Sequence, residues 1–214
     1  MKLYSYFRSS AAYRVRIALG LKQLPYDLVP IHLVNNGGEH RSPEYAELNP
    51  QQLVPLLSDG GVNIAQSLAM MEYLDEAYPE APALLPTDPA ARARVRAIAL
   101  LIVADTHPLN NMRVLKYLVK TLGLDEEQKM QWYRHWIHEN FVALEQILQS
   151  EQTGQFCHGD TPTLADCCLV PQVYNARRFD CDLSEFPTIV RIADNCNRLV
   201  AFQQAAPEQQ PDFS

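Results

Sequence analysis

The fold begins with a short run, Leu3-Tyr4-Ser5-Tyr6-Phe7, which leads into the stretch Ser9-Ser10-Ala11-Ala12-Tyr13-Arg14-Val15-Arg16-Ile17-Ala18-Leu19. The run has the length and aromatic content of a buried strand. Ser9 and Ser10 therefore lie at a strand-to-helix turn, where one hydroxyl caps the helix and the other stays beside unpaired backbone N–H groups. Because the positive end of the helix dipole lies at the same corner, this stretch suits an anion such as a thiolate. Simple helix capping is the alternative.

The next 60 residues predict a small α/β domain. Residues 26–33 alternate in character and indicate a second strand. Residues 53–57 and Val62–Ala65 flank Asp59-Gly60-Gly61, which predicts a β-hairpin. Ser67 is expected to cap a helix whose apolar positions recur on one face as far as Tyr78. The order βαβ, short helix, hairpin and helix predicts a sheet covered on both sides.

A proline-rich connection follows, with prolines at 79, 82, 86 and 89, and we place a domain boundary there. Residues 89–120 and 125–149 then show a helical apolar period, interrupted by Pro108. Thr163 and Asp166 form a capping-box pattern that opens a helix to about Arg178, and a last helix follows Pro187. We therefore predict domains at 1–82 and 83–214, the second all-α.

Composition excludes several function classes. Eighteen Lys and Arg against 25 Asp and Glu give a net charge of -7, which is unfavourable for a nucleic-acid partner. No apolar stretch is long enough for a membrane span, and Met1-Lys2 leads directly into the first strand without a signal region, so we expect a soluble, cytoplasmic protein with no membrane partner. Five cysteines without a C-x-x-C pair indicate free thiols used in packing.

Other catalytic classes lack their usual motifs. His135 and His138 lie three residues apart on a predicted helix, but the spacing is not H-E-x-x-H, and we expect no metal site. The chain has no G-x-S-x-G, no phosphate-binding G-x-x-x-x-G-K-[ST] and no G-x-G-x-x-G. Hydrolase, nucleotide-binding and dinucleotide-binding functions therefore have no sequence support.

Three features of the first domain converge on a peptide-like anion. The Ser9-Ser10 corner and the Gln66-Ser67 corner each precede a helix, and helix N-termini that follow strands gather along one sheet edge. Pro55 follows Val54 at the start of the hairpin, where a cis bond would turn the polar groups of Val54 outward. A ligand with peptide groups, a carboxylate and a thiolate matches these sites, although capping and edge placement explain each one singly.

These segments together resemble the cytosolic glutathione transferases. The resemblance rests on the order of elements, Val54-Pro55, Gln66-Ser67, the proline-rich link, and Gly159-Asp160 ahead of Thr163-Leu164-Ala165-Asp166. Residues 9–16 resemble the S-S-C-x-x-R-V-R motif of the zeta class, whose members include maleylacetoacetate and glutathione-dependent maleylpyruvate isomerases. It implies a thioredoxin-like α/β N-terminal domain followed by an all-α C-terminal domain, in a homodimer.

The resemblance also implies roles for individual residues. Ser9 would activate the sulfur of glutathione, with Ser10 supporting and Arg8 stabilising the charge that develops on the substrate. The residues implied to bind glutathione are Ser9, His40, Val54, Gln66, Ser67, His107 and Asn111. Arg8, Arg113 and Arg178 would bind the carboxylates of the substrate, for which a bidentate guanidinium is well suited; for Arg178, a helix-end role is the alternative.

The chain departs from the motif at Ala11, where the zeta class has cysteine. Glutathione brings its own sulfur, so we expect that cysteine to be dispensable. Tyr6 is a competing activator, but strand alternation places it with Tyr4 on a core or edge face.

The implied activity is glutathione-dependent cis–trans isomerisation of a small unsaturated diketo dicarboxylic acid in the breakdown of tyrosine, phenylalanine or aromatic acids. The thiolate would add to the double bond, allow rotation and leave again. A transferase that conjugates or dehalogenates small electrophiles and a non-catalytic binding module are the alternatives.

Overall fold

The computed structural model describes residues 1–213, which group into two compact units. One unit contains residues up to Leu84 together with the segment that starts at Asn197, and the other spans Leu85–Cys196. This division differs from the predicted 1–82 and 83–214, because the C-terminal segment belongs with the first unit. The helix α10 in that segment packs on the first helix of the chain, and no local sequence pattern predicts this long-range contact.

The first unit is built around a four-stranded mixed sheet. Its elements are β1 (Lys2–Ser5), α1 (Ser10–Leu21), β2 (Asp27–Pro30), η1 (Asn35–Gly37), η2 (Glu39–Arg41), α2 (Pro43–Leu48), β3 (Leu56–Asp59), β4 (Val62–Ala65), α3 (Ser67–Ala77), α10 (Val200–Ala205) and η4 (Pro207–Gln209). The strand order is β2-β1-β3-β4, with β1 parallel to β2 and antiparallel to β3. This is the predicted α/β arrangement.

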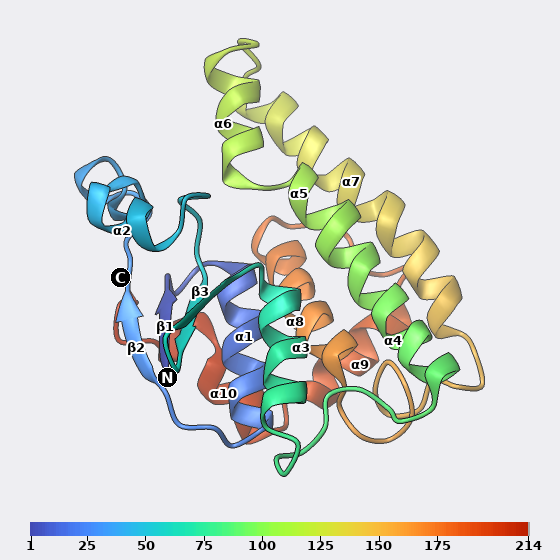
Figure 1. Ribbon diagram of the computed structural model, residues 1–214. Helices are drawn as coiled ribbons and strands as arrows, with labels where there is room; N and C mark the ends of the chain where they lie inside the picture. Colours follow the sequence, from blue (N-terminus) through green and yellow to red (C-terminus); the bar gives the residue numbers. More distant parts are fainter. Residues whose placement is uncertain (214) are drawn as a thin grey trace. The chain divides into compact units, whose positions relative to one another are not determined.

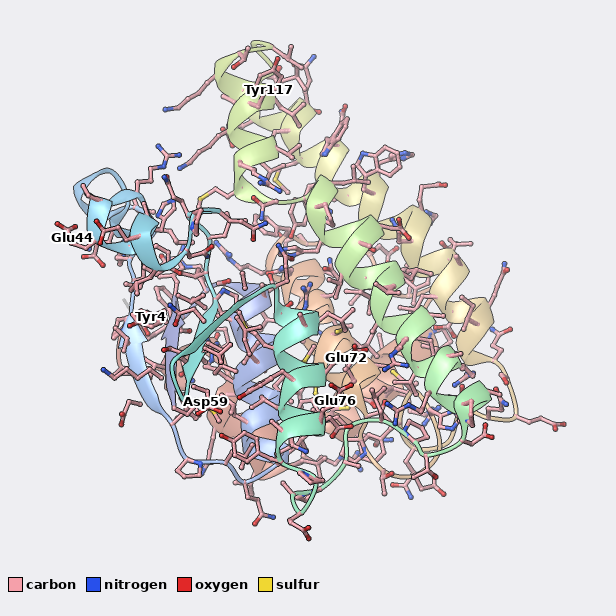
Figure 2. All side chains as sticks on the ribbon, in the orientation of Figure 1. Tyr4, Glu44, Asp59, Glu72, Glu76 and Tyr117 are labelled. Carbon is pink, nitrogen blue, oxygen red and sulfur yellow. The ribbon has the colours of Figure 1, made fainter. Side chains whose placement is uncertain are left out.

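The predicted hairpin is confirmed. Asp59 pairs with Val62, so the turn is the two residues Gly60 and Gly61, with φ of 55° and 88°. Such a turn needs positive φ at both central residues, which glycine adopts without strain. Asp59, labelled in Figure 2, also accepts hydrogen bonds from the hydroxyls of Tyr73 and Tyr78, so the hairpin is fastened to α3 and the residue that follows it.

Helices cover both faces of the sheet. The Arg16 guanidinium of α1 donates to Ser5 Oγ over 3.1 Å, so Ser5 faces α1, and Figure 1 shows α3 beside that helix. Tyr4 points to the opposite face, where its ring meets Tyr45 of α2 edge-on at 6.0 Å between centroids. Because Tyr4 and Ser5 alternate along β1, the two contacts identify the two covered faces.

All the regular elements of the second unit are helices. Its elements are α4 (Pro89–Leu100), η3 (Leu101–Thr106), α5 (His107–Leu109), α6 (Met112–Lys120), α7 (Glu126–Leu148), α8 (Leu164–Arg178) and α9 (Pro187–Cys196). The interruption expected near Pro108 is a π-helical turn, η3, in which the Thr106 hydroxyl donates to the Leu101 carbonyl over 3.1 Å. Proline supplies no N–H and so breaks the regular ladder.

The capping box of α8 is confirmed and is buried. Asp166 accepts from the Thr163 N–H at 2.7 Å, the Thr163 hydroxyl at 2.9 Å and the Cys157 N–H at 2.8 Å. Burial raises the pKa of Asp166, although these hydrogen bonds act against the shift. The box therefore fixes both the start of α8 and the loop that contains Cys157.

The five cysteines are free, as the sequence predicts, and four of them are buried. Among residues 1–213, no helix is both long enough and apolar enough to cross a bilayer.

Candidate functional site

Ser9 is the N-cap residue of α1. It has extended backbone angles (φ -71°, ψ 115°), and its Oγ accepts from the Ala12 N–H at 3.2 Å. The first turn of α1 contains no acidic residue, so the positive end of the helix dipole is not neutralised there. Ser10 is the first helical residue and is buried, so it is Ser9, only half-buried, whose hydroxyl does the capping. Ser9 is therefore the capping hydroxyl of the pair, and the anion site at this corner stays a prediction.

Tyr6, the competing activator, lies in the core of the first unit. Its side chain is 6% exposed, and its ring packs edge-on against Phe7 at 4.7 Å and His32 at 5.0 Å between centroids. This packing favours Ser9 over Tyr6 as the hydroxyl that meets a ligand.

The N-terminus of α3 is the second anion-friendly corner, with one correction to the sequence analysis. Gln66 is the N-cap residue, not Ser67, and its side chain makes no capping hydrogen bond. Gln66 has φ of 70°, and its Nε2 donates instead to Gln51 Oε1 at 2.9 Å. Ser67 is the buried first residue of the helix, and its Oγ accepts from Arg14 Nη1 at 3.3 Å. The backbone donors of this first turn are not capped by Gln66, and no acidic residue lies among them.

Val54 lies between the two corners in the sequence, and its neighbour is held from α2. The Leu53 carbonyl accepts from the Tyr45 hydroxyl at 2.7 Å and from Asn49 Nδ2 at 2.8 Å. The Val54–Pro55 peptide bond is cis, the form that the sequence analysis considered. Burial raises the pKa of Tyr45 from 10 to about 12, so its hydroxyl keeps its proton and keeps donating further into the alkaline range.

His40 lies in η2 and is 8% exposed. Gly38 permits this position, because a Cβ on Gly38 would lie 2.4 Å from His40 Cε1 and 2.8 Å from Nδ1. Gly38 also has φ of 102°, which side-chain-bearing residues rarely adopt. The backbone before η2 is fixed by the Glu39 carboxylate, which accepts from the His32 N–H at 2.7 Å.

The three arginines that are predicted to bind the substrate are exposed. Arg8 follows β1, with its guanidinium carbon 4.8 Å from the centre of the Phe7 ring. Arg178 ends α8 and lies over Phe179 at 4.9 Å, which retains the helix-end alternative. Arg113 lies in the first turn of α6 and is exposed.

His107 and Asn111 belong to the helical unit. His107 begins α5 directly after the π-helical turn and is half-buried. Asn111 is the N-cap of α6, and its Oδ1 accepts from the Arg113 N–H at 3.1 Å. That cap occupies the carbonyl oxygen of the side chain, so its amide nitrogen is the group with donors to offer a ligand.

The structure also brings in residues to which the sequence analysis assigned no role, namely Arg14, Gly38, Tyr45 and Asn49. Arg14 is the one with a visible sequence signal, since it and Arg16 are the two cations in a helix that is otherwise mainly apolar. Gly38 leaves room for the His40 ring, and Tyr45 and Asn49 donate to the Leu53 carbonyl.

The two corners fit the groups of glutathione. A γ-glutamyl carboxylate needs hydrogen-bond donors and positive potential, and the first turn of α3 with Ser67 and the buried Arg14 supplies both. A thiolate needs a hydroxyl donor and a helix N-terminus, and Ser9 at the start of α1 supplies both.

Comparisons with known proteins identify the family of the chain. Residues 3–82 match the family described as "Glutathione S-transferase, N-terminal domain". A probable maleylacetoacetate isomerase from Vibrio cholerae is 54% identical over 210 residues, covering 98% of this chain and 97% of that protein. The holo structure of a maleylpyruvate isomerase, described as a bacterial glutathione S-transferase of the zeta class, has 48% identity, a TM-score of 0.96 and full coverage of both chains. A maleylacetoacetate isomerase structure from Methylobacterium extorquens, with bound malonate and glutathione, has 37% identity, a TM-score of 0.93 and full coverage of both chains.

Proposed function

We propose, from the premise that this chain belongs to the zeta class of glutathione transferases, that it is a glutathione-dependent isomerase. Its substrate would be a small unsaturated diketo dicarboxylic acid, maleylacetoacetate or maleylpyruvate, converted from the cis to the trans isomer. The observation that carries the proposal is near-complete coverage at about half identity with isomerases of these two names. Such a reaction belongs to the breakdown of tyrosine, phenylalanine or other aromatic acids.

Glutathione would be held at the two helix corners of the first unit. In the proposal, Ser67 and Gln66 bind the γ-glutamyl carboxylate, the backbone of Val54 pairs with the peptide, and His40 also holds the peptide. The resemblance to the family also implies His107 and Asn111, which belong to the helical unit, as glutathione-binding residues. When bound, glutathione supplies a thiolate that adds reversibly to the substrate double bond, so that this bond can rotate.

Ser9 is the proposed activator of the sulfur. The Ser9 Oγ accepts a hydrogen bond from the Ala12 N–H through one lone pair, and the hydroxyl proton remains available for a thiolate. The unneutralised N-terminus of α1 stabilises negative charge at the same place. Ser10 supports this corner as the first residue of the helix. The protein therefore needs no cysteine at position 11, where it has Ala11.

Arginines are the proposed partners of the substrate. A diketo dicarboxylic acid carries two carboxylates, and a guanidinium binds each with two parallel hydrogen bonds. Arg8 follows the strand that leads to Ser9, so we assign it a carboxylate and the charge that develops during the reaction. Arg113 and Arg178 are proposed for the remaining carboxylate. Their exposure leaves the guanidinium groups accessible to a ligand.

Two further properties complete the proposal. The resemblance to glutathione transferases supports a homodimer. The five free cysteines support a reducing location such as the cytoplasm.

The test mixes purified protein with maleylacetone or maleylpyruvate, with and without glutathione, and follows loss of the cis isomer. We expect rapid, glutathione-dependent isomerisation with glutathione fully recovered at the end. Stoichiometric loss of glutathione would indicate a conjugating or dehalogenating transferase instead. No acceleration, together with retention on immobilised glutathione, would indicate a binding module.

A further inference from the structure

Arg14 is a buried cation that contacts Ser67 at the N-terminus of α3, where the γ-glutamyl carboxylate of glutathione is proposed to bind. It lies on α1, is 1% exposed and is one of the largest fully buried side chains. Its Nη1 donates to Ser67 Oγ at 3.3 Å, a contact between residues 53 positions apart. Burying a guanidinium costs free energy unless its hydrogen bonds and charge are used. The hydrogen bond to Ser67 satisfies one of the N–H donors of Arg14.

Arg16, two residues along the same helix, provides the contrast. It is equally buried, and its guanidinium donates to Ser5 Oγ at 3.1 Å and to the carbonyls of Phe7 at 3.0 Å and Ala205 at 2.9 Å. These contacts tie the end of β1 to α10 and reach no proposed ligand group. Arg16 is therefore structural, whereas Arg14 ends on a side chain of the proposed site.

The direction of the hydrogen bond between Arg14 and Ser67 determines how Ser67 can use its own proton. A hydroxyl has one proton to donate and lone pairs to accept. Because Ser67 Oγ accepts from Arg14, its own proton is directed to a different acceptor. That proton joins the backbone donors of the first turn of α3, which the Gln66 side chain does not cap. The arrangement presents donors to an anion and places a positive charge behind them.

We infer that Arg14 is a positioning residue for the γ-glutamyl carboxylate of glutathione. It orients the Ser67 hydroxyl as a donor and adds positive potential at the N-terminus of α3. The inference rests on the proposed function only in that the ligand of this corner is glutathione; it does not depend on the isomerase reaction.

The test compares two ligands by titration calorimetry on the full chain. The first is glutathione, and the second is 4-aminobutanoyl-cysteinylglycine, which is the same tripeptide without the γ-glutamyl α-carboxylate. We expect the wild type to bind glutathione about 10- to 100-fold more tightly, the range for hydrogen bonds to a charged group. Arg14→Met should reduce this preference about tenfold, mainly by weakening glutathione. Arg16→Lys is the matched control, since loosening α1 there should leave the preference unchanged.

A double-mutant cycle separates positioning from general damage. In the Arg14→Met background, Ser67→Ala should cost much less of the preference than it costs in the wild type, because the two residues act as a unit. Arg14→Gln, which keeps an N–H donor for Ser67, should recover part of the preference, and it decides the matter if Arg14→Met does not fold. The inference would be overturned if either Arg14 variant kept the full wild-type preference for glutathione. It would also be overturned if the losses of preference from the Arg14 and Ser67 substitutions were independent, so that they multiplied in the double variant. A protein that keeps the preference but fails to isomerise would contradict the proposed function alone.

Discussion

The Ser9 hydroxyl accepts a hydrogen bond from the Ala12 backbone N–H across 3.2 Å. This bond makes Ser9 the cap of α1 and uses one of its lone pairs, while the proton stays available. Capping and thiolate activation are therefore compatible roles of the same side chain. The first two predictions follow from this relationship.

Ser9→Ala should lower kcat/KM for isomerisation by about 10²- to 10³-fold, the usual cost of losing one donor to a developing or stabilised anion. The lost cap should also lower the free energy of unfolding by about 1 kcal/mol. Ser9→Thr keeps a hydroxyl and a cap and serves as the matched control. Steady-state kinetics at saturating glutathione check the result. A larger loss in Tyr6→Phe than in Ser9→Ala would reverse the assignment.

Ala11→Cys should change kcat/KM by less than about threefold, because glutathione brings its own sulfur and Ser9 with the helix end stabilises it. The same kinetic assay measures this variant beside the wild type. If the added cysteine raised activity by more than Ser9→Ala lowers it, the serine-centred account would be wrong.

Gly38→Ala should raise the KM for glutathione about tenfold with kcat nearly unchanged. The new Cβ would meet the His40 ring at 2.4 Å, and displacing this ring should remove the proposed contact of His40 with glutathione. Gly37→Ala is the matched control, since Gly37 also has positive φ (80°), but a Cβ there would meet nothing within 4 Å. Equal effects of the two variants would show that backbone strain, not His40, is responsible.

Asp166→Ala should lower the free energy of unfolding by about 3 kcal/mol or more. It leaves the buried N–H groups of Thr163 and Cys157 without their acceptor, and each such loss costs about 1–3 kcal/mol. Urea unfolding measures the change. Asp160→Ala is the comparison: Asp160 also accepts a backbone N–H, from Gln155 at 3.0 Å, but at an exposed position, so we expect a loss of about 1 kcal/mol or less. Similar values for both variants would contradict the importance of burial.

Tyr78→Phe should flatten the alkaline pH dependence of unfolding. The hydrogen bond to Asp59, with burial second, raises the pKa of Tyr78 from 10 to about 12. The stability gained from the neutral hydroxyl is therefore complete below pH 10 and is lost as the pH rises to about 12. Urea unfolding between pH 9 and 12 should show a steeper fall in the wild type than in Tyr78→Phe. Exposed Tyr117, labelled in Figure 2, provides the control variant Tyr117→Phe, which should behave like the wild type.

Local patterns were sufficient for most elements of the fold. The Gly60-Gly61 turn, the capping box of Thr163 and Asp166, and the break near Pro108 are each encoded by residues within a few positions of one another. Their physics is local: backbone φ, a cap or a missing N–H. The Ser9 corner was predictable for the same reason. Gln66 as the N-cap of α3 was not, because its positive φ is not a preference of glutamine.

The sequence by itself determined the order of elements, the two helix corners and, through motif resemblance, the class of chemistry. Only the tertiary structure decided that the segment from Asn197 joins the first unit, that Arg14 supports Ser67, and that Gly38 makes room for His40. These relationships depend on where distant segments meet once the apolar faces are buried. Hydrogen bonds and steric limits between such segments are set by packing, which no short stretch of sequence specifies.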